Sequence, residues 1–526
     1  MKLYKLFFIA AIALGFMACN ADDQPEVPQL EQETDTYASI TVKFPGTVGT
    51  RAVPGDYNAD GEWKGRDALR SVTVFLVNMD RAEVIHDQFT ASHFTGIEDG
   101  YLQPSLAIKA TAGDSIRAFV VINGDDGVAG GILETLKNVT AADFETEFAK
   151  AYNKIASDVA SYDATTNKET IMMTNDMNGY STRLLPGITA EAAKTGPDNH
   201  INIQVERVVS RAFMTVVKNP ETGWPVYAVI GGNPETEIAR VTNVTYAVGQ
   251  SNKNFYLMKQ SDYAVPAPVY GFKPTTFTEW DGSKTVNFDY EGLADNNFTS
   301  ITQWIGETKT IIDYLREEAT SKFVLPVNHL VELEADEVGA RDAYRKGNTT
   351  FFEIRATFTP NVLYDAEITY NELEEVESIG ALTTVQDPST ADTVFWGEND
   401  KKFYTSRVLA ESFGQQATEF PGRVMKYVLW LNPNSYDTSV ENPNPKISPT
   451  VRNQIYHAHI DAFLRMGLPN NPLNPNDQDN PLNPDNPINP EDLLKTDYTY
   501  LSVSVQVLPW TIHSYTYDLK DPGTMY

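Results

Sequence analysis

The stretch Leu501-Ser-Val-Ser-Val-Gln-Val507 alternates apolar and polar side chains. Because successive side chains of a strand point to opposite faces, this period of two predicts a β-strand with one buried face. Beyond Pro509 an apolar series continues almost to the end of the chain. The apolar residues of the whole segment are Leu501, Val503, Val505, Val507, Trp510, Ile512, Tyr515, Tyr517 and Leu519. A hydrophobic strand in this position invites edge-to-edge association unless a partner groove receives it.

The same alternation recurs near the N-terminus, where Ile40, Val42 and Phe44 are separated by Thr41 and Lys43. Further runs rich in β-branched and aromatic residues cover 70–77, 115–122, 239–248, 323–333, 350–359, 402–408, 424–431 and 453–463. One helix is predicted to begin after Thr140, and its apolar stripe consists of Phe144, Phe148, Tyr152, Ile155 and Val159. Many strands and few helices predict an all-β fold made of β-sandwiches.

Two polar segments divide this pattern. A Gly- and Pro-containing stretch at 186–199 separates two β-rich halves, so we predict a domain boundary near residue 200. The second segment, 468–491, repeats Asn-Pro-Leu-Asn-Pro or Asn-Pro-Ile-Asn-Pro from positions 471, 480 and 486. Proline at this density disfavours helix and central-strand pairing, which predicts an extended arm. A solvated surface loop is the alternative.

The N-terminus resembles a bacterial lipoprotein signal. Lys2 and Lys5 precede a short apolar run, and Cys19, the single cysteine of the chain, follows Ala18 directly. A lone thiol cannot form an intrachain disulfide, so we interpret Cys19 as an acyl acceptor; the alternative is an ordinary signal peptide. After the first strand, Arg51 stands in a turn-like context, where cleavage before Ala52 and an uncleaved linker both remain open.

The composition excludes several functional classes. The chain has 526 residues and a net charge of −30, which argues against nucleic acid as a partner. No motif for nucleophilic, metal or phosphate chemistry is present, so we predict neither enzymatic activity nor a cofactor. His457 and His459 share a strand face, but with no third ligand suggested we predict a packed pair and not a metal site. Residues 56–67 resemble a calcium loop on paper, although Lys64 at its ninth position favours a polar turn.

Several segments together resemble one family, the fimbrillins of the Bacteroidales, and within it the shaft subunits of short, Mfa-type fimbriae. The matching segments are spread over nearly the whole chain. They are Leu14–Cys19, Arg345–Thr349, Ile354–Pro360, Trp430–Pro433, Val451–Ile460, the Asn- and Pro-rich arm, and Val507–Leu519. Phe16 stands where such signals often have Leu, and Lys520–Tyr526 extends beyond the usual end.

This resemblance implies two tandem transthyretin-like β-sandwich domains in a lipoprotein precursor of the outer membrane. It implies that a secreted Arg-specific protease removes the segment up to Arg51, and that subunits then polymerise head to tail by donor-strand exchange. Ile40, Val42 and Phe44 would form the removable strand, and the segment from Leu501 to Leu519 the donor. The implied divisions are a signal peptide (1–18), a propeptide (19–51), two sandwiches (52–200 and 201–467), the arm (468–494) and the C-terminal strand segment (495–526).

The implied partners are other copies of the chain, anchor and tip subunits, the protease, and host or bacterial adhesion receptors. The expected location is a cell-surface fimbrium, where the protein would support adhesion and biofilm formation. Two alternatives stay open at this point. One is an anchor or tip subunit of the same family, and the other is a surface glycan-binding lipoprotein, for which abundant Tyr and Trp are the only indication.

Overall fold

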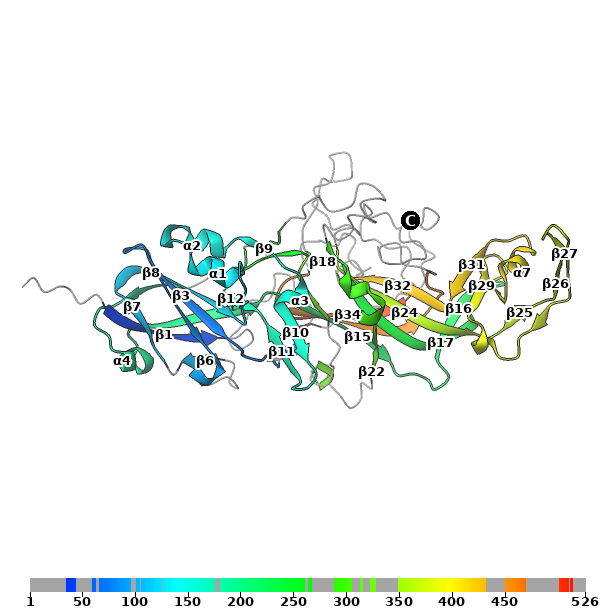
Figure 1. Cartoon of the computed structure of the whole chain (residues 1–526). Coiled ribbons are helices and arrows are strands. Elements are labelled where there is room, and N and C mark those ends of the chain that lie inside the picture. Colours follow the sequence, from blue (N-terminus) through cyan, green and yellow to red (C-terminus); the bar gives the residue numbers. More distant parts are fainter. Residues whose placement is uncertain are drawn as a thin grey trace, which may run out of the picture.

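The structure of the chain is a computed structural model. It describes residues 35–43, 59–62, 66–95, 101–104, 106–125, 127–175, 180–260, 264–266, 288–304, 313–315, 322–327, 349–431, 450–469, 501–509 and 511–513. These residues form an elongated molecule of two large β-sheets in tandem, with few helices (Figure 1). The predicted class, mostly β with two β-sheet domains, is confirmed. Among the described residues, no helix is long and apolar enough to cross a membrane.

The first sheet contains strands from the N-terminal 207 residues. Its order is β4 (Glu83–Phe89), β3 (Val72–Asn78), β8 (Gly113–Ile122), β12 (Met173–Asn175), β14 (His200–Arg207), β1 (Asp35–Lys43), β6 (Tyr101–Pro104) and β5 (Phe94–Thr95). Two strands pair beside this path: β13 (Ser181–Leu184) with β8, and β7 (Ile108–Thr111) with β1.

Both faces of this sheet are covered, which explains the continuous apolar runs in β3 and β8. Val74 and Val120 pack in one core cluster, whereas their neighbours Phe75 and Phe119 pack in another on the opposite face. Strands buried on both faces lose the alternation that half-buried strands show. The second cluster includes apolar residues of α1 (Ile132–Lys137), α2 (Ala141–Phe148) and α3 (Ala156–Val159).

The second sheet follows after a sharp turn of the chain. Its order is β22 (Thr302–Trp304), β15 (Ser210–Val217), β33 (Gln454–Phe463), β16 (Trp224–Ile230), β17 (Asn233–Gly249), β24 (Phe351–Pro360) and β32 (Val424–Trp430). Three strands pair beside this path: β21 (Thr299–Ser300) with β17, β23 (Lys322–Val324) with β15, and β34 (Leu501–Pro509) with β33. The chain thus passes from the first sheet to the second between Arg207 and Ser210, several residues later than the boundary near 200 that the sequence suggested.

A smaller lobe lies beyond the second sheet. It consists of β28 (Thr383–Thr384), β25 (Leu363–Asp365), β30 (Phe403–Tyr404), β29 (Thr393–Gly397) and β31 (Ala417–Pro421), with α7 (Arg407–Glu411) against them. A separate hairpin, β26 (Ile368–Tyr370) and β27 (Val376–Ile379), projects from it at the end of the molecule that lies opposite β1 and β7 (Figure 1).

Short pairings complete the fold. They are β10 (Ala160–Asp163) with β11 (Lys168–Ile171), β18 (Ser251–Asn252) with β20 (Phe288–Asp289), β19 (Asn254–Tyr256) with β9 (Ala151–Asn153), and β2 (Ala59–Glu62) with β35 (Thr511–His513). Helix α4 (Ala190–Thr195) lies next to β1 (Figure 1).

Two local predictions were wrong. The helix after Thr140 ends at Phe148, because the chain then turns into β9. In β9, Tyr152 pairs with Phe255 of β19 in a separate two-stranded sheet. The strand expected over 402–408 covers only two residues. It stops because the Ser406 hydroxyl accepts a hydrogen bond from the Leu409 backbone N–H and so caps α7.

Candidate functional site

Strand β1 is hydrogen-bonded on both of its edges. It runs parallel to β14, from the pair Ser39 and His200 to the pair Lys43 and Gln204. On its other edge it runs antiparallel to β7 and then to β6. A strand near the N-terminus therefore lies inside the sheet and not at its edge, and its loss would leave an open slot between β14 and the β6–β7 edge.

The side chains of β1 make this position apolar. Ala38, Ile40 and Val42 are no more than 3% exposed and belong to the core cluster that also contains residues of β3 and β8. Between them, the Ser39 hydroxyl is buried and has no hydrogen-bond partner among the described residues. β1 therefore contributes to the apolar core of the first sheet.

Polar contacts fix the first half of β1. The Asn199 side chain donates to the Thr36 hydroxyl (2.8 Å), the Tyr37 carbonyl (3.0 Å) and the Leu185 carbonyl (2.9 Å). At the surface, Lys109 of β7 forms a 2.9 Å ion pair with Asp35. Hydrogen bonding to Asp35 and the charge of its carboxylate raise the pKa of Lys109. Removal of β1 would thus leave Asn199 and Lys109 without these partners on the strand.

The C-terminal strand residues pair within their own chain in this structure. β34 lies antiparallel to β33, from the pair of Phe463 with Leu501 to the pair of Gln454 with Pro509. The following strand β35, which contains Ile512, pairs with β2. Leu501, Val503, Val505 and Val507 are therefore in a strand, as the alternation predicted. Phe44, Cys19, Arg51, Ala52, Trp510, Tyr515, Tyr517 and Leu519 lie outside the described residues.

The two histidines of β33 form a packed pair. The Thr215 hydroxyl lies 2.7 Å from His457 Nε2 and 2.8 Å from His459 Nδ1, and the ring of His457 stacks on Phe213. Burial lowers the pKa of His459, with a smaller opposing effect from Asp461. The described residues contain no group of three or more metal-ligating side chains. Of the 56–67 loop that resembles a calcium site, Ala59–Glu62 form β2, and Asp67 forms an ion pair with buried Arg207.

A buried cluster of charges at the junction of the two sheets escaped the sequence analysis. Glu169 of β11 is fully buried between Arg66, at 2.9 Å, and Arg211 of β15, at 3.1 Å. Burial lowers the pKa of Arg211 to about 10, which leaves it charged at neutral pH. Arg452 lies nearby and donates to the carbonyls of Arg207 and Tyr256. The only sequence signal was Arg207 and Arg211, which flank the apolar pair Val208-Val209 and precede the apolar run that begins at Ala212.

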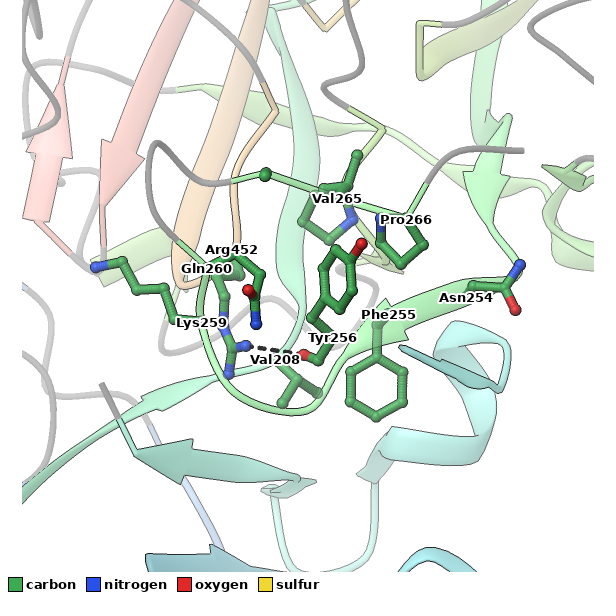
Figure 2. A pocket seen from close by; sticks show the side chains of 11 residues that line it. Val208, Asn254, Phe255, Tyr256, Lys259, Gln260, Val265, Pro266 and Arg452 are labelled. Atoms are coloured by element: carbon green, nitrogen blue, oxygen red, sulfur yellow. Dashed lines mark hydrogen bonds between the residues drawn. The ribbon is translucent and has the colours of Figure 1, made fainter. Parts of the chain in front are cut away.

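A small pocket lies beside this cluster (Figure 2). Val208, Phe255, Tyr256, Pro266 and Arg452 are among its lining residues, and the dashed line in Figure 2 marks the hydrogen bond from Arg452 to Tyr256. Its volume of about 30 Å³ has room for water but not for a sugar ring. This pocket therefore gives no support to the glycan-binding alternative.

Comparison with known proteins adds an independent observation. Residues 418–516 match the family model of the C-terminal region of fimbrillin, the type IV major fimbrial subunit protein. Over 542 residues the chain is 27% identical to the minor fimbrium subunit Mfa1 of Porphyromonas gingivalis, covering 98% of this chain and 99% of that protein. Among solved structures, the fimbrilin FimA of the same organism gives a TM-score of 0.35 at 14% identity, over 91% of this chain and 99% of FimA. The tip fimbrial protein Mfa3, truncated at its C-terminus, gives 0.33 at 12% identity, over 81% and 95%.

Proposed function

We propose that this chain, which belongs to the fimbrillin family of the Bacteroidales, is a structural subunit of a cell-surface fimbrium. The similarity to a minor fimbrium subunit extends over 98% of the chain, so it covers both sheets and the C-terminal strands. The family is structural and not enzymatic. The subunit polymerises with other fimbrial subunits and supports adhesion and biofilm formation.

The precursor is exported as a lipoprotein of the outer membrane, acylated at Cys19, and is cleaved between Arg51 and Ala52 by a secreted Arg-specific protease. The observation that carries this proposal is the position of β1. A strand that precedes Arg51 lies inside the first sheet with apolar side chains almost fully buried. Its removal by cleavage would create an apolar slot with unpaired backbone groups on both sides.

The C-terminal segment of the next subunit fills this slot. β1 and β34 are both nine residues long, and in the sequence of each a series of apolar residues alternates with polar ones: Ala38, Ile40 and Val42 in β1, and Leu501, Val503, Val505 and Val507 in β34. Apolar burial stabilises by about 25 cal/mol per Å², and ladder hydrogen bonds set the register of the inserted strand. Head-to-tail insertion does not close on itself, so its product is a filament.

The role of a shaft subunit fits these features better than that of an anchor or a tip. An anchor would keep its lipid and would need no cleavage site, whereas a tip would not need to donate a strand. The chain has both Arg51 after its first strand and an apolar C-terminal segment. N-terminal sequencing of fimbriae sheared from cells tests the proposal, and the expected first residue is Ala52.

The first prediction concerns export. Cys19→Ala is expected to leave the precursor unlabelled by a fatty-acid probe and to reduce its delivery to the cell surface severalfold, because the acyl acceptor is lost. Metabolic labelling and surface immunoblotting measure both effects. Equal labelling of the variant and the parent protein would contradict the assignment.

The second prediction concerns cleavage. Arg51→Ala is expected to accumulate uncut precursor and to reduce the number of fimbriae at least tenfold, because β1 would keep the slot filled. Immunoblotting of cell fractions and electron microscopy measure these quantities. Arg51→Lys is the matched control that keeps the charge but removes the Arg specificity. Normal fimbriae from the Ala variant would show that cleavage occurs elsewhere or is not required.

A further inference from the structure

The lobe at the far end of the second sheet is an insertion between two neighbouring strands. β24 and β32 are hydrogen-bonded to each other from Phe351 with Trp430 to Thr357 with Val424. A short turn would connect such strands. The chain instead forms the lobe between Pro360 and Val424, with a small core of its own around Tyr404 and Leu409. The lobe is thus additional to the sheet that supports it.

The β26–β27 hairpin of this lobe ends in a tightly bonded turn. The Asn371 side chain accepts hydrogen bonds from the backbone N–H groups of Leu373 and Glu375, both at 2.9 Å. Its amide group donates to the Glu375 carboxylate at 3.1 Å. Glu374 takes the left-handed conformation, with a φ of 61°, that closes the turn. The turn is therefore closed by hydrogen bonds to one side chain, that of Asn371.

This turn exposes apolar side chains within an acidic stretch of sequence. Leu373 at its apex is 77% exposed, and Tyr370 and Val376 on the flanking strands are 52% and 43% exposed. Between 366 and 380 the sequence has no Lys or Arg, and its five acidic residues are Glu367, Glu372, Glu374, Glu375 and Glu377. Apolar side chains held out by an ordered turn indicate an interaction site.

We propose that the β26–β27 turn docks onto a cationic partner protein, whose apolar pocket receives Leu373 and whose Lys and Arg side chains contact the surrounding carboxylates. The charge of the turn determines this choice of partner. Its five carboxylates, with no Lys or Arg among them, complement a surface that carries Lys and Arg side chains.

The test measures binding of a defined cationic probe to the full chain. The probe is a fluorescent peptide of four Lys-Leu-Leu-Lys repeats, and anisotropy gives its Kd in about 0.05 M and about 0.5 M NaCl, where screening differs strongly. One variant carries Glu372→Gln, Glu374→Gln, Glu375→Gln and Glu377→Gln, and another carries Leu373→Ser. The matched control neutralises four exposed acidic residues outside the lobe: Glu191→Gln, Asp198→Asn, Glu221→Gln and Glu235→Gln.

The quadruple hairpin variant is expected to raise the Kd about tenfold at low salt, and Leu373→Ser about fivefold at both salt concentrations, whereas the control changes it less than twofold. Thermal unfolding by circular dichroism verifies that all variants are folded. An equal effect of the control, or no effect of Leu373→Ser, would overturn the proposal. So would loss of fimbriae in Leu373→Ser, because the turn would then contact another copy. Absence of fimbriae in the parent protein would instead count against the proposed function alone.

Discussion

Deletion of residues 511–526 is expected to yield soluble, cleaved monomer and no fimbrial polymers. The deletion removes β35 and the apolar side chains Tyr515, Tyr517 and Leu519, which form the distal part of the proposed donor Leu501–Leu519. Its proximal part, β34, stays on β33, and the shortened donor would be too short to hold the next subunit. The described core clusters are formed by residues from β1 to β33 and the turn that follows, so both sheets should stay folded. Electron microscopy and size-exclusion chromatography measure assembly, and circular dichroism measures the fold.

Matched substitutions at Tyr515 and Tyr517 show whether the deletion acts by shortening the segment or by removing its apolar side chains. Tyr515→Asp with Tyr517→Asp should abolish polymers as the deletion does, because unpaired carboxylates in an apolar slot cost several kcal/mol. Tyr515→Phe with Tyr517→Phe keeps the rings and should assemble normally. Truncated protein that still forms fimbriae would exclude the segment as the donor. Truncated protein that is unfolded would show that the segment belongs to the core of its own subunit.

The pairing of β34 with β33 adds a sharper version of this experiment. Ala458 and Val505 are directly opposite each other in the two strands. Cysteines at such positions can form a disulfide, and cleavage after Arg51 would remove Cys19, the single native cysteine. If β34 must leave β33 to enter the next subunit, the double variant Ala458→Cys with Val505→Cys should polymerise only after reduction. Polymerisation of the oxidised variant would restrict the donor to residues after Pro509.

Sequence periodicity predicted the strands because the pattern of buried and exposed faces of a strand appears in consecutive residues. The apolar run of β3 follows directly from its two buried faces, and the alternation over Leu501–Val507 falls in the strand β34. Pairings between distant residues leave no such signal. Tyr152 continues a helical stripe on paper, yet it pairs with Phe255, more than 100 residues away. The lobe was missed for the same reason, since only the pairing of β24 with β32 identifies it as an insertion.

In the candidate site, too, the residues of the strand could be predicted from the sequence, whereas its neighbours in the sheet could not. Ile40 and Val42 were found from their spacing, and the structure places both in the core. That β1 lies inside the sheet, bonded on both edges, could not be predicted, because strand order depends on the whole chain. Buried charges are the clearest failure. Glu and Arg side chains are usually exposed to solvent, so the sequence alone suggests surface positions for Glu169 and Arg211. Only the folded chain brings the two together as a buried ion pair.

Glu169→Gln is expected to destabilise the folded chain by about 3–5 kcal/mol, the usual cost of removing one partner from a buried ion pair. The neutral amide cannot compensate Arg66 and Arg211, whose guanidinium groups would remain out of water beside it. Urea unfolding measures the change in the free energy of unfolding. Glu237→Gln is the matched control, because its partner Arg240 lies in a half-exposed pair and such pairs contribute at most about 1 kcal/mol.

Glu169 and Arg211 belong to different parts of the fold. The residue lies on the β10–β11 hairpin, which follows the helices of the first half, and Arg211 lies on the first strand of the second sheet. Their contact therefore joins the β10–β11 hairpin to the second sheet, close to the point where the chain passes from the first large sheet to the second. Glu169→Gln with Arg211→Met should recover part of the lost stability, because one uncompensated charge is replaced by an apolar side chain. A loss below about 1 kcal/mol in the single variant would show that the charges gain water or other partners, and that this junction does not depend on them.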